Sequence, residues 1–237
     1  MAGGERVCAI LPAFNEERRV GEVVREVRAL GVDVAVVDDG STDGTAQAAR
    51  EAGAVVLEHI RNRGKGMALF TGFEWAREEG YELALTMDAD GQHAASDIPA
   101  FLAAWRRTRA GVIVGDRTGE AAKMPWSRRM TNHRMSKTLS KLMRQWVPDT
   151  QCGFRLYHRS AFPPEAPARG DRRFAAESAE LLRLAMAGVR IGSVPVQTIY
   201  AGERSKIRPV RDALRYWWML RRFKRAKRKH ERIAEKQ

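Results

Sequence analysis

The sequence predicts an α/β protein built on a doubly wound, mainly parallel β-sheet. Short apolar runs, several of them rich in valine as buried parallel strands are, alternate with segments whose apolar residues recur at helical spacing. The chain has 237 residues, of which 44% are hydrophobic. This is enough for one such domain with a sizeable core and a short appendage.

The first half of the chain carries the regular alternation. We expect strands at 7–11, 32–37, 54–57 and 83–87, and helices between them at 16–30, 46–52 and 67–79. Ligands of such sheets bind beyond the carboxyl ends of the strands, where three polar loops fall, at 12–17, 38–41 and 88–93. No Gly-x-Gly-x-x-Gly follows the first strand, which argues against a dinucleotide redox cofactor.

The second half is less regular. We expect helices at 97–108, 126–146 and 174–187, a strand at 112–114, a loop running into a strand at 148–158, and an extended segment at 189–200. Pro195 in that last segment indicates an edge strand. Beyond Arg208 apolar residues recur at helical spacing, so we expect a globular domain over 1–208 and a basic amphipathic C-terminal helix over 209–237.

Positive charge is concentrated in that tail. The chain has a formal net charge of +13, and residues 203–237 hold 14 Lys and Arg against 4 Asp and Glu. Such a segment indicates a phosphate-bearing surface, either nucleic acid or anionic lipid. No apolar run reaches the roughly 18 residues that span a bilayer, and residues 1–6 do not form a secretory signal. Cys8 and Cys152 fit no disulfide framework or zinc site, so we expect a reducing, cytoplasmic setting.

Two acids follow the strand at 83–87. Asp88 and Asp90 are spaced i and i+2, which places both carboxylates on one side of a turn at the edge of the sheet. Carboxylates at that spacing repel each other unless a cation lies between them. Mg²⁺ and Mn²⁺ favour oxygen ligands and often combine one or two carboxylates with substrate phosphates. We therefore expect a divalent metal site; the alternative is a solvated turn rich in Asp.

Five motifs occur in order within residues 7–210. They are LPAFNEE at 11–17, VDDGSTDG at 37–44, NRGKG at 62–66, MDADGQ at 87–92 and DTQCGFR at 149–155. Together they resemble the family 2 glycosyltransferases of the polyprenyl-phosphate type, which include dolichol-phosphate mannose synthase. The resemblance implies the GT-A fold of nucleotide-diphospho-sugar transferases, an Asp-x-Asp metal site, and inverting transfer from a nucleotide sugar.

The resemblance assigns the first motifs to the nucleotide-sugar donor. Asp39 would accept hydrogen bonds from the base, while Asp38 braces the turn. Lys65 would contact the diphosphate or the base edge, unless it is an ordinary solvated loop lysine. The implied metal ligands are Asp88, Asp90 and Gln92. The implied donor-binding residues are Pro12, Ala13, Asn15, Glu17, Asp39, Lys65 and Asp88.

A second group of residues is mainly cationic and is assigned to the acceptor. Arg129, Asn132 and Ser136 share one face of the helix at 126–146, with the register open by about one residue. Glu177 is either a site residue or an anchor for Arg155. The resemblance implies an acceptor-phosphate set of Arg117, Arg129, Ser136, Arg204 and Lys206, and a catalytic set of Asp90, Arg117, Arg129 and Lys206.

These observations predict transfer of a sugar from GDP-mannose or a UDP-hexose to a polyprenyl phosphate. A phosphate monoester is already anionic at neutral pH because its second pKa is about 6, so the reaction needs no strong general base. Trp217 and Trp218, followed by a Lys/Arg cluster, resemble an interfacial anchor, which predicts peripheral binding at the inner face of an anionic membrane. The alternative is that these aromatic side chains pack on the core.

The sequence leaves two alternatives to transfer onto a lipid phosphate. Transfer to a hydroxyl would need a general base, for which Asp149 and Glu177 are the candidates. Binding of nucleic acid is disfavoured because the chain shows no recognisable nucleic-acid fold or aromatic platform.

Overall fold

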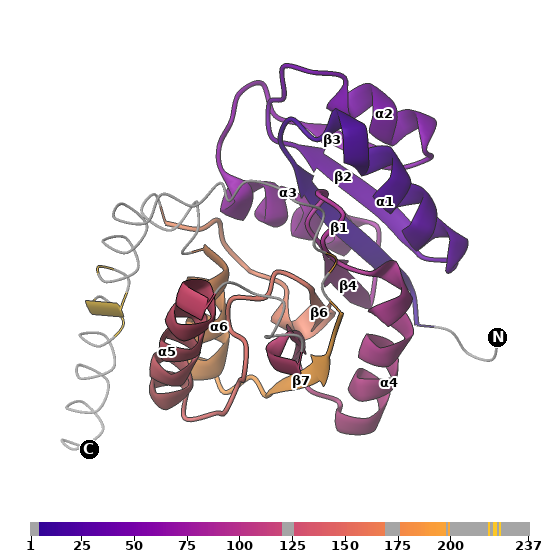
Figure 1. The fold of residues 1–237 in the computed structure, drawn as a ribbon. Helices are drawn as coiled ribbons and strands as arrows, with labels where there is room; N and C mark the ends of the chain where they lie inside the picture. The colour runs from indigo at the N-terminus through magenta and orange to yellow at the C-terminus, as the bar shows by residue number, and fades with distance from the viewer. Residues whose placement is uncertain are drawn as a thin grey trace.

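The computed structural model describes residues 5–119, 126–168, 176–197 and 199, together with Trp218, Leu220, Arg221 and Phe223. In this part of the chain seven strands form one mixed sheet, in the order β3-β2-β1-β4-β6-β5-β7 (Figure 1). The strands are β1 (Val7–Ala13), β2 (Asp33–Asp38), β3 (Val55–Glu58), β4 (Leu83–Thr86), β5 (Val112–Asp116), β6 (Arg155–His158) and β7 (Ile191–Pro195).

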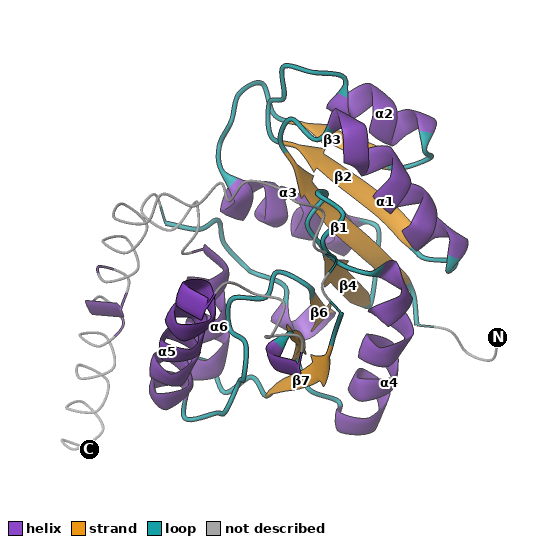
Figure 2. Cartoon of the chain, viewed as in Figure 1, coloured by secondary structure: helices purple, strands orange, loops and turns teal. Residues whose placement is uncertain are grey.

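Six α-helices of the described residues flank the sheet (Figure 2). They are α1 (Glu17–Ala29), α2 (Thr45–Glu51), α3 (Lys65–Glu78), α4 (Ile98–Thr108), α5 (Trp126–Met143) and α6 (Ala176–Met186). Short 3₁₀ turns, η1 (Ala95–Asp97) and η3 (Arg159–Ala161), precede α4 and follow β6. The predicted alternation of strands and helices is therefore confirmed, with shifts of one to three residues at most element ends.

The first half of the sheet is parallel because each crossover returns through a helix. β1 pairs in parallel with β2 on one side and with β4 on the other. Its residues Cys8, Ala9, Ile10 and Leu11 have no exposed surface, as expected for a central strand covered on both faces. α3 packs directly on β1 at Gly72, where a Cβ atom would lie 2.2 Å from Cγ2 of Ile10.

The second half of the sheet contains one reversal. β6 runs antiparallel to both of its neighbours, β4 and β5, and β7 pairs in parallel with β5 at the edge of the sheet. The edge position of β7 agrees with the prediction from Pro195. The reversal places the chain before Arg155 beside the carboxyl end of β4, because Thr86 and Arg155 are partners in the ladder.

Several predicted features of the C-terminal part lie outside the described residues. They include Arg204, Lys206, Trp217 and most of the segment 209–237. Of the described tail residues, Phe223 is buried and Leu220 packs against the hydrophobic core, while Trp218 is 60% exposed. Among the residues that the structure describes, no helix combines the length and the apolar character that crossing a membrane requires.

Candidate active site

Three loops meet at the carboxyl edge of the sheet, because the strands that lead into them, β2, β1 and β4, are neighbours. The first two loops are joined by hydrogen bonds. The Asn15 amide donates to Oγ of Ser41 at 2.9 Å, and Oδ1 of Asn15 accepts from the Thr42 amide at 2.9 Å. Asn15 has a φ of 55°, a left-handed conformation that asparagine tolerates better than most residues. The predicted donor loops are thus held together as one unit.

The remaining predicted residues of the first loop line the same edge. Pro12 is half-buried and Ala13 is buried, whereas Glu17 is the exposed first residue of α1. The Glu17 amide donates to Oδ2 of Asp43 at 3.3 Å, which again links the first loop to the second. Their predicted contacts with a nucleotide stay predictions.

Asp38 and Asp39 of the second loop form hydrogen bonds with different parts of the chain. Asp38 accepts from both the amide and the hydroxyl of Ser41, so the prediction that it braces the turn is confirmed. The Asp39 carboxylate accepts from Nδ1 of His59 at 2.7 Å and from the amides of Arg63 and Gly64 at 2.8 and 2.7 Å. Asp39 therefore holds the third motif in place, and its predicted bond to a base would have to be added to these.

Lys65 is the first residue of α3 and lies in a cluster with two carboxylates. Its Nζ is 2.5 Å from Oδ1 of Asp88 and 3.0 Å from Oε2 of Glu177. Lys65 is therefore no ordinary solvated loop lysine. Glu177 makes both kinds of contact: its main-chain oxygen accepts from Arg155 at 2.9 Å, and its carboxylate contacts Lys65.

Gly153 lies against this cluster. A Cβ atom at this position would be 3.0 Å from Nζ of Lys65, 3.1 Å from Oε1 of Glu177 and 3.2 Å from Oδ2 of Asp88. The backbone thus approaches all three charged groups because no side chain separates them. The Gly153 carbonyl is fixed by a hydrogen bond from the Thr86 hydroxyl at 2.9 Å, which ties the DTQCGFR loop to the end of β4.

The charges of the cluster support one another. Burial alone would lower the pKa of Lys65, but Asp88 and Glu177 raise it above its ordinary value. Burial alone would raise the pKa of Asp88, but Lys65 and His93 hold it below its usual range. Lys65 is therefore an ammonium and Asp88 a carboxylate at neutral pH.

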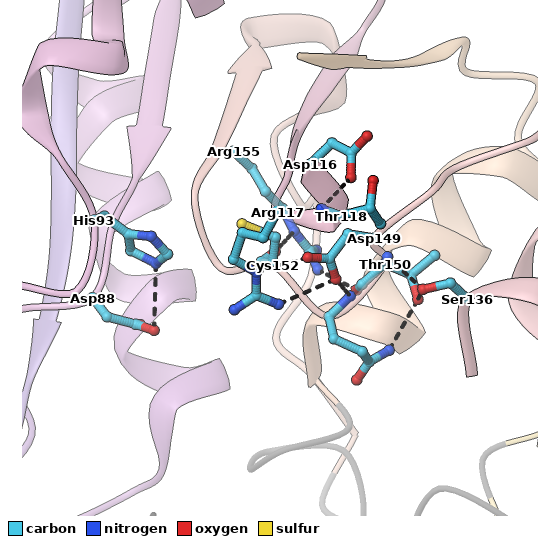
Figure 3. Close-up of polar contacts among 11 residues, drawn as sticks. Asp88, His93, Asp116, Arg117, Thr118, Ser136, Asp149, Thr150, Cys152 and Arg155 are labelled. Atoms are coloured by element: carbon cyan, nitrogen blue, oxygen red, sulfur yellow. Dashed lines mark hydrogen bonds and ion pairs between the residues drawn. The ribbon is translucent and has the colours of Figure 1, made fainter. Parts of the chain in front are cut away.

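His93 approaches the other oxygen of Asp88, with Nε2 3.7 Å from Oδ2 (Figure 3). Its ring is buried and lies 5.2 Å from the ring of Phe154. Nδ1 of His93 and Oε1 of Glu177 are the buried side-chain atoms of the described residues that have no hydrogen-bond partner. Two such atoms near one carboxylate indicate a place where a ligand completes the bonding.

Asp90 and Gln92 continue the loop. Oδ1 of Asp90 accepts from the Gln92 amide at 3.0 Å and closes an Asx turn. Asp88 and Asp90 remain partly exposed, and within the described residues no group of three or more His, Cys, Asp or Glu side chains could hold a metal. Two carboxylates alone fit a hard divalent cation that draws its other oxygen ligands from phosphates and water.

Arg117 faces this loop from the end of β5 and is held by Asp149. Nε of Arg117 donates to Oδ2 of Asp149 at 2.7 Å, and the second bond of the fork, to Oδ1, is 3.1 Å (Figure 3). Burial alone would lower the pKa of Arg117, but nearby acidic groups, Asp149 and Asp88 among them, raise it. A guanidinium has five N–H donors, so Arg117 can bind Asp149 on one edge and another anion on the other.

The predicted helix residues differ in accessibility. Arg129 lies on the exposed surface of α5. Ser136 is buried, and its hydroxyl bonds to Oγ1 of Thr150 at 3.1 Å and accepts from the Thr150 amide at 2.9 Å. Ser136 therefore fastens the DTQCGFR loop to α5 from inside the protein, which leaves its predicted contact with a phosphate without geometric support.

The segment after β7 returns to the acidic loop. The Gln197 amide donates to Oδ2 of Asp97 at 2.8 Å, and the Ile199 amide donates to the main-chain oxygen of Gln92 at 3.0 Å. The chain is thus anchored at the acidic loop five residues before Arg204. Arg204 and Lys206 themselves lie outside the described residues.

Comparison with known proteins gives the site its chemical class. The family model described as glycosyl transferase family 2 matches residues 8–163. The chain belongs to glycosyl transferase family 2. This membership confirms the predicted family and makes the protein a glycosyltransferase.

Individual relatives of this glycosyltransferase span most of its length. It is 30% identical over 215 residues to a UDP-N-acetylglucosamine–dolichyl-phosphate N-acetylglucosaminyltransferase of Methanococcus voltae, covering 82% of this chain and 86% of the relative. It is 31% identical over 202 residues to an undecaprenyl-phosphate mannosyltransferase of Micrococcus luteus, covering 81% and 82%.

The fold is shared with solved structures. One is glucosyl-3-phosphoglycerate synthase of Mycobacterium tuberculosis, solved with Mn²⁺, uridine diphosphate and phosphoglyceric acid. Its TM-score with this glycosyltransferase is 0.66 at 20% identity, over 93% of this chain and 78% of the other. The GT-A fold expected from the sequence is therefore confirmed.

The glycosyltransferase site also contains contacts that sequence reasoning missed. The pairs Arg117–Asp149 and His59–Asp39 had no local signal, since 32 and 20 residues separate the partners. The second pair could have been found from the strand register, because β2 and β3 align Asp38 with Glu58 and so place the next residues side by side. The first depends on the packing of two loops.

Proposed function

We propose that this glycosyltransferase moves a sugar, with inversion, from a nucleotide-diphosphate sugar to the phosphate of a polyprenyl phosphate at a membrane surface. GDP-mannose and UDP-hexoses are the candidate donors, and dolichyl and undecaprenyl phosphates are the candidate acceptors. The two relatives named above support a polyprenyl-phosphate acceptor, because each is named for transfer to such a lipid.

The observation that carries the proposal is the placement of Arg117. Asp149 orients its guanidinium from one edge through bonds of 2.7 and 3.1 Å, and its side chain keeps 16% exposure beside the acidic loop. A planar guanidinium has a second edge besides the one that Asp149 holds, and such an edge is suited to grip a phosphate with two parallel hydrogen bonds. A neutral sugar hydroxyl would gain less from a fixed full charge.

A divalent cation, Mg²⁺ or Mn²⁺, is proposed at Asp88 and Asp90, with Gln92 as a third candidate ligand. When bound, such an ion supplies Lewis-acid stabilisation of the leaving nucleoside diphosphate. The solved structure with Mn²⁺ and uridine diphosphate supports a metal in this fold. The cationic side chains of the protein then offset the repulsion between the donor diphosphate and the acceptor phosphate, which must approach each other.

Catalysis by these residues consists of positioning and charge neutralisation. Lys65 meets the donor diphosphate, and Arg117 fixes the acceptor phosphate within reach of the sugar. Arg204 and Lys206 are proposed to close over both, because they follow Ile199 by only five and seven residues and the Ile199 amide is bonded to Gln92 in the acidic loop. Arg129, at the exposed surface of α5, would contact the lipid phosphate from outside.

One experiment tests the function directly. The purified protein is incubated with a panel of acceptors (undecaprenyl or dolichyl phosphate, a polyprenol, and a glycan), a panel of nucleotide sugars, and Mg²⁺ or Mn²⁺. The sugar transferred to each acceptor is then measured. Formation of a sugar–phosphate–lipid with one donor supports the proposal and identifies the sugar. Transfer to a polyprenol or glycan hydroxyl, with none to the lipid phosphate, contradicts it.

The basic tail is proposed to hold the enzyme at the inner face of the membrane. Each Lys or Arg near an anionic leaflet contributes roughly 1 kcal/mol, so the cluster over 221–229 could bind without a membrane span. Deletion of residues 212–237 should abolish co-sedimentation with liposomes that contain anionic lipid. Unchanged co-sedimentation after the deletion would contradict this part of the proposal.

A second function is favoured by one observation. Oε1 of Glu177 is buried and has no partner among the described residues, so it is available to a hydroxyl as well as to a phosphate-bound water. In that case Glu177 would be the general base for transfer to a hydroxyl. The acceptor panel decides between the two, because a polyprenyl phosphate has no hydroxyl that needs deprotonation by a base.

A further inference from the structure

The ammonium of Lys65 occupies one oxygen of a carboxylate that the proposed function gives to a metal. Nζ is 2.5 Å from Oδ1 of Asp88, so the ammonium and this carboxylate oxygen form a direct ion pair. Two cations on one carboxylate repel each other. Lys65 and a metal ion therefore compete for Asp88 as long as no other anion is present.

Glu177 provides Lys65 with a second anchor that does not belong to the metal loop. Its Oε2 is 3.0 Å from Nζ, and it belongs to the first turn of α6, not to the loop that carries Asp88. The ammonium can thus leave Asp88 without losing all its ionic partners. Gly153 leaves room for this displacement because it has no side chain. A Cβ atom at this position would lie only 3.0 Å from Nζ.

We propose that Lys65 is a tethered counter-cation of the donor site. It neutralises Asp88 while the site is empty, and it moves its hydrogen bond from Asp88 to the donor diphosphate when donor and metal bind together, with Glu177 retaining it throughout. The inference rests on the function proposed above. In it Lys65 contacts the donor, and Glu177 is a positioning residue that acts through Lys65.

This arrangement couples metal and nucleotide. Without a nucleotide, the ammonium weakens the attraction of Asp88 for a divalent cation. With a nucleotide, the diphosphate takes the ammonium, and the carboxylate is released for the metal. The exchange makes each ligand favour the binding of the other, which suits an enzyme that should not hold its metal without its substrate.

The test measures Mn²⁺ binding by the electron paramagnetic resonance signal of the free ion, so it needs no turnover. The variants are Lys65→Met, which removes the charge, and Lys65→Arg, which keeps it. Lys137→Met, which removes an exposed lysine of α5, is the matched control. We expect Lys65→Met to bind Mn²⁺ without nucleotide about 10-fold more tightly than the wild type, since one repelling charge is gone. Lys65→Arg and the control should bind like the wild type.

The second arm adds uridine or guanosine diphosphate at saturating Mn²⁺. Lys65→Met should then bind the nucleotide about 10-fold more weakly, because a charge-assisted hydrogen bond is lost. Glu177→Gln should weaken nucleotide binding in the wild-type background but not in Lys65→Met, because Glu177 acts through Lys65. A purely structural Glu177 would weaken binding equally in both backgrounds.

The outcomes separate this inference from the function on which it rests. Unchanged Mn²⁺ affinity in Lys65→Met, in a variant whose thermal melting shows a folded protein, overturns the counter-cation role. If that variant is unstable, Mn²⁺ should raise its melting temperature more than that of the wild type, and an equal rise also overturns the inference. If the wild type binds Mn²⁺ but no nucleotide, the proposed function is contradicted. The measurement without nucleotide still shows whether Lys65 and Mn²⁺ compete for Asp88.

Discussion

The replacement Asp149→Asn separates two roles for the Arg117–Asp149 pair. The carboxylate is 5% exposed, and both of its oxygens accept from Arg117, at 2.7 and 3.1 Å. Oδ1 also accepts from the Gln151 amide at 3.1 Å, so Asp149 has little capacity left to take a proton from a substrate. We therefore expect Asp149 to position Arg117 and not to act as a general base.

The expected loss of stability and activity in Asp149→Asn follows from the hydrogen bonds that asparagine can still form. Its side-chain oxygen still accepts from Arg117, but the charge and one arm of the fork are lost, which costs roughly 1.5–3 kcal/mol. In a chain of this size the melting temperature should fall by about 2–4 °C per kcal/mol. If the same free energy is lost from the orientation of Arg117 toward the acceptor, kcat/KM should fall about 10- to 100-fold.

The assay measures transfer to polyprenyl phosphate as a function of acceptor concentration and pH. We expect a higher KM for the acceptor and an unchanged pH profile. Glu180→Gln serves as the control, because it breaks a comparable pair, with Arg183 at 2.7 Å, and should lower stability but leave turnover intact. Refutation would be a loss of kcat beyond about 1,000-fold, with unchanged acceptor KM and a vanished acidic limb of the pH profile, as removal of a general base gives.

Three further predictions concern the metal loop, the core and one ionisable pair. Asp90→Asn should abolish transfer and leave liposome binding intact, as measured by glycolipid formation and co-sedimentation. Gly72→Ala should lower the free energy of unfolding in urea by about 1–3 kcal/mol through overpacking against Ile10, despite a helix-propensity gain of about 1 kcal/mol. Burial and a hydrogen bond to Asp33 raise the pKa of Tyr81 to about 12. Stability should therefore fall as pH rises from about 10, where the unfolded tyrosine ionises, toward 12, and Tyr81→Phe should flatten this fall in melting temperature.

The arrangement of the loops that the sequence assigned to the donor was largely predictable. A doubly wound sheet places the ends of β1, β2 and β4 side by side, so acids at the ends of these strands were expected to converge. The bracing role of Asp38 followed from local turn chemistry and is confirmed. The start of α3 was placed too late, because no capping side chain precedes Lys65 and the glycine there has a φ of 94°.

The partnerships in the second half could not be predicted in the same way. The antiparallel insertion of β6 between β4 and β5 depends on long-range pairing, and it brings Gly153 beside Asp88 across 65 residues of sequence. Glu177 was expected to be either a site residue or an anchor for Arg155, and which of its contacts with Lys65 and Arg155 form depends on where α6 packs. Such choices are decided by tertiary packing and leave no periodic signal.

The two cations that are proposed to bind phosphates have one feature in common: each forms an ion pair with at least one carboxylate of the protein. Lys65 contacts Asp88 and Glu177, and Arg117 contacts Asp149.

If net charge alone governed phosphate binding, Asp149→Asn would strengthen it, because the site becomes one unit more positive. If orientation governs it, the same change weakens binding, and added salt does not reverse the difference because short-range hydrogen bonds are screened little. The structure favours orientation, since a paired guanidinium offers a fixed edge before the substrate arrives and does not have to be ordered during the reaction. The sign of the change in acceptor affinity, measured at low and at high salt, therefore shows whether these acids serve to position the cations.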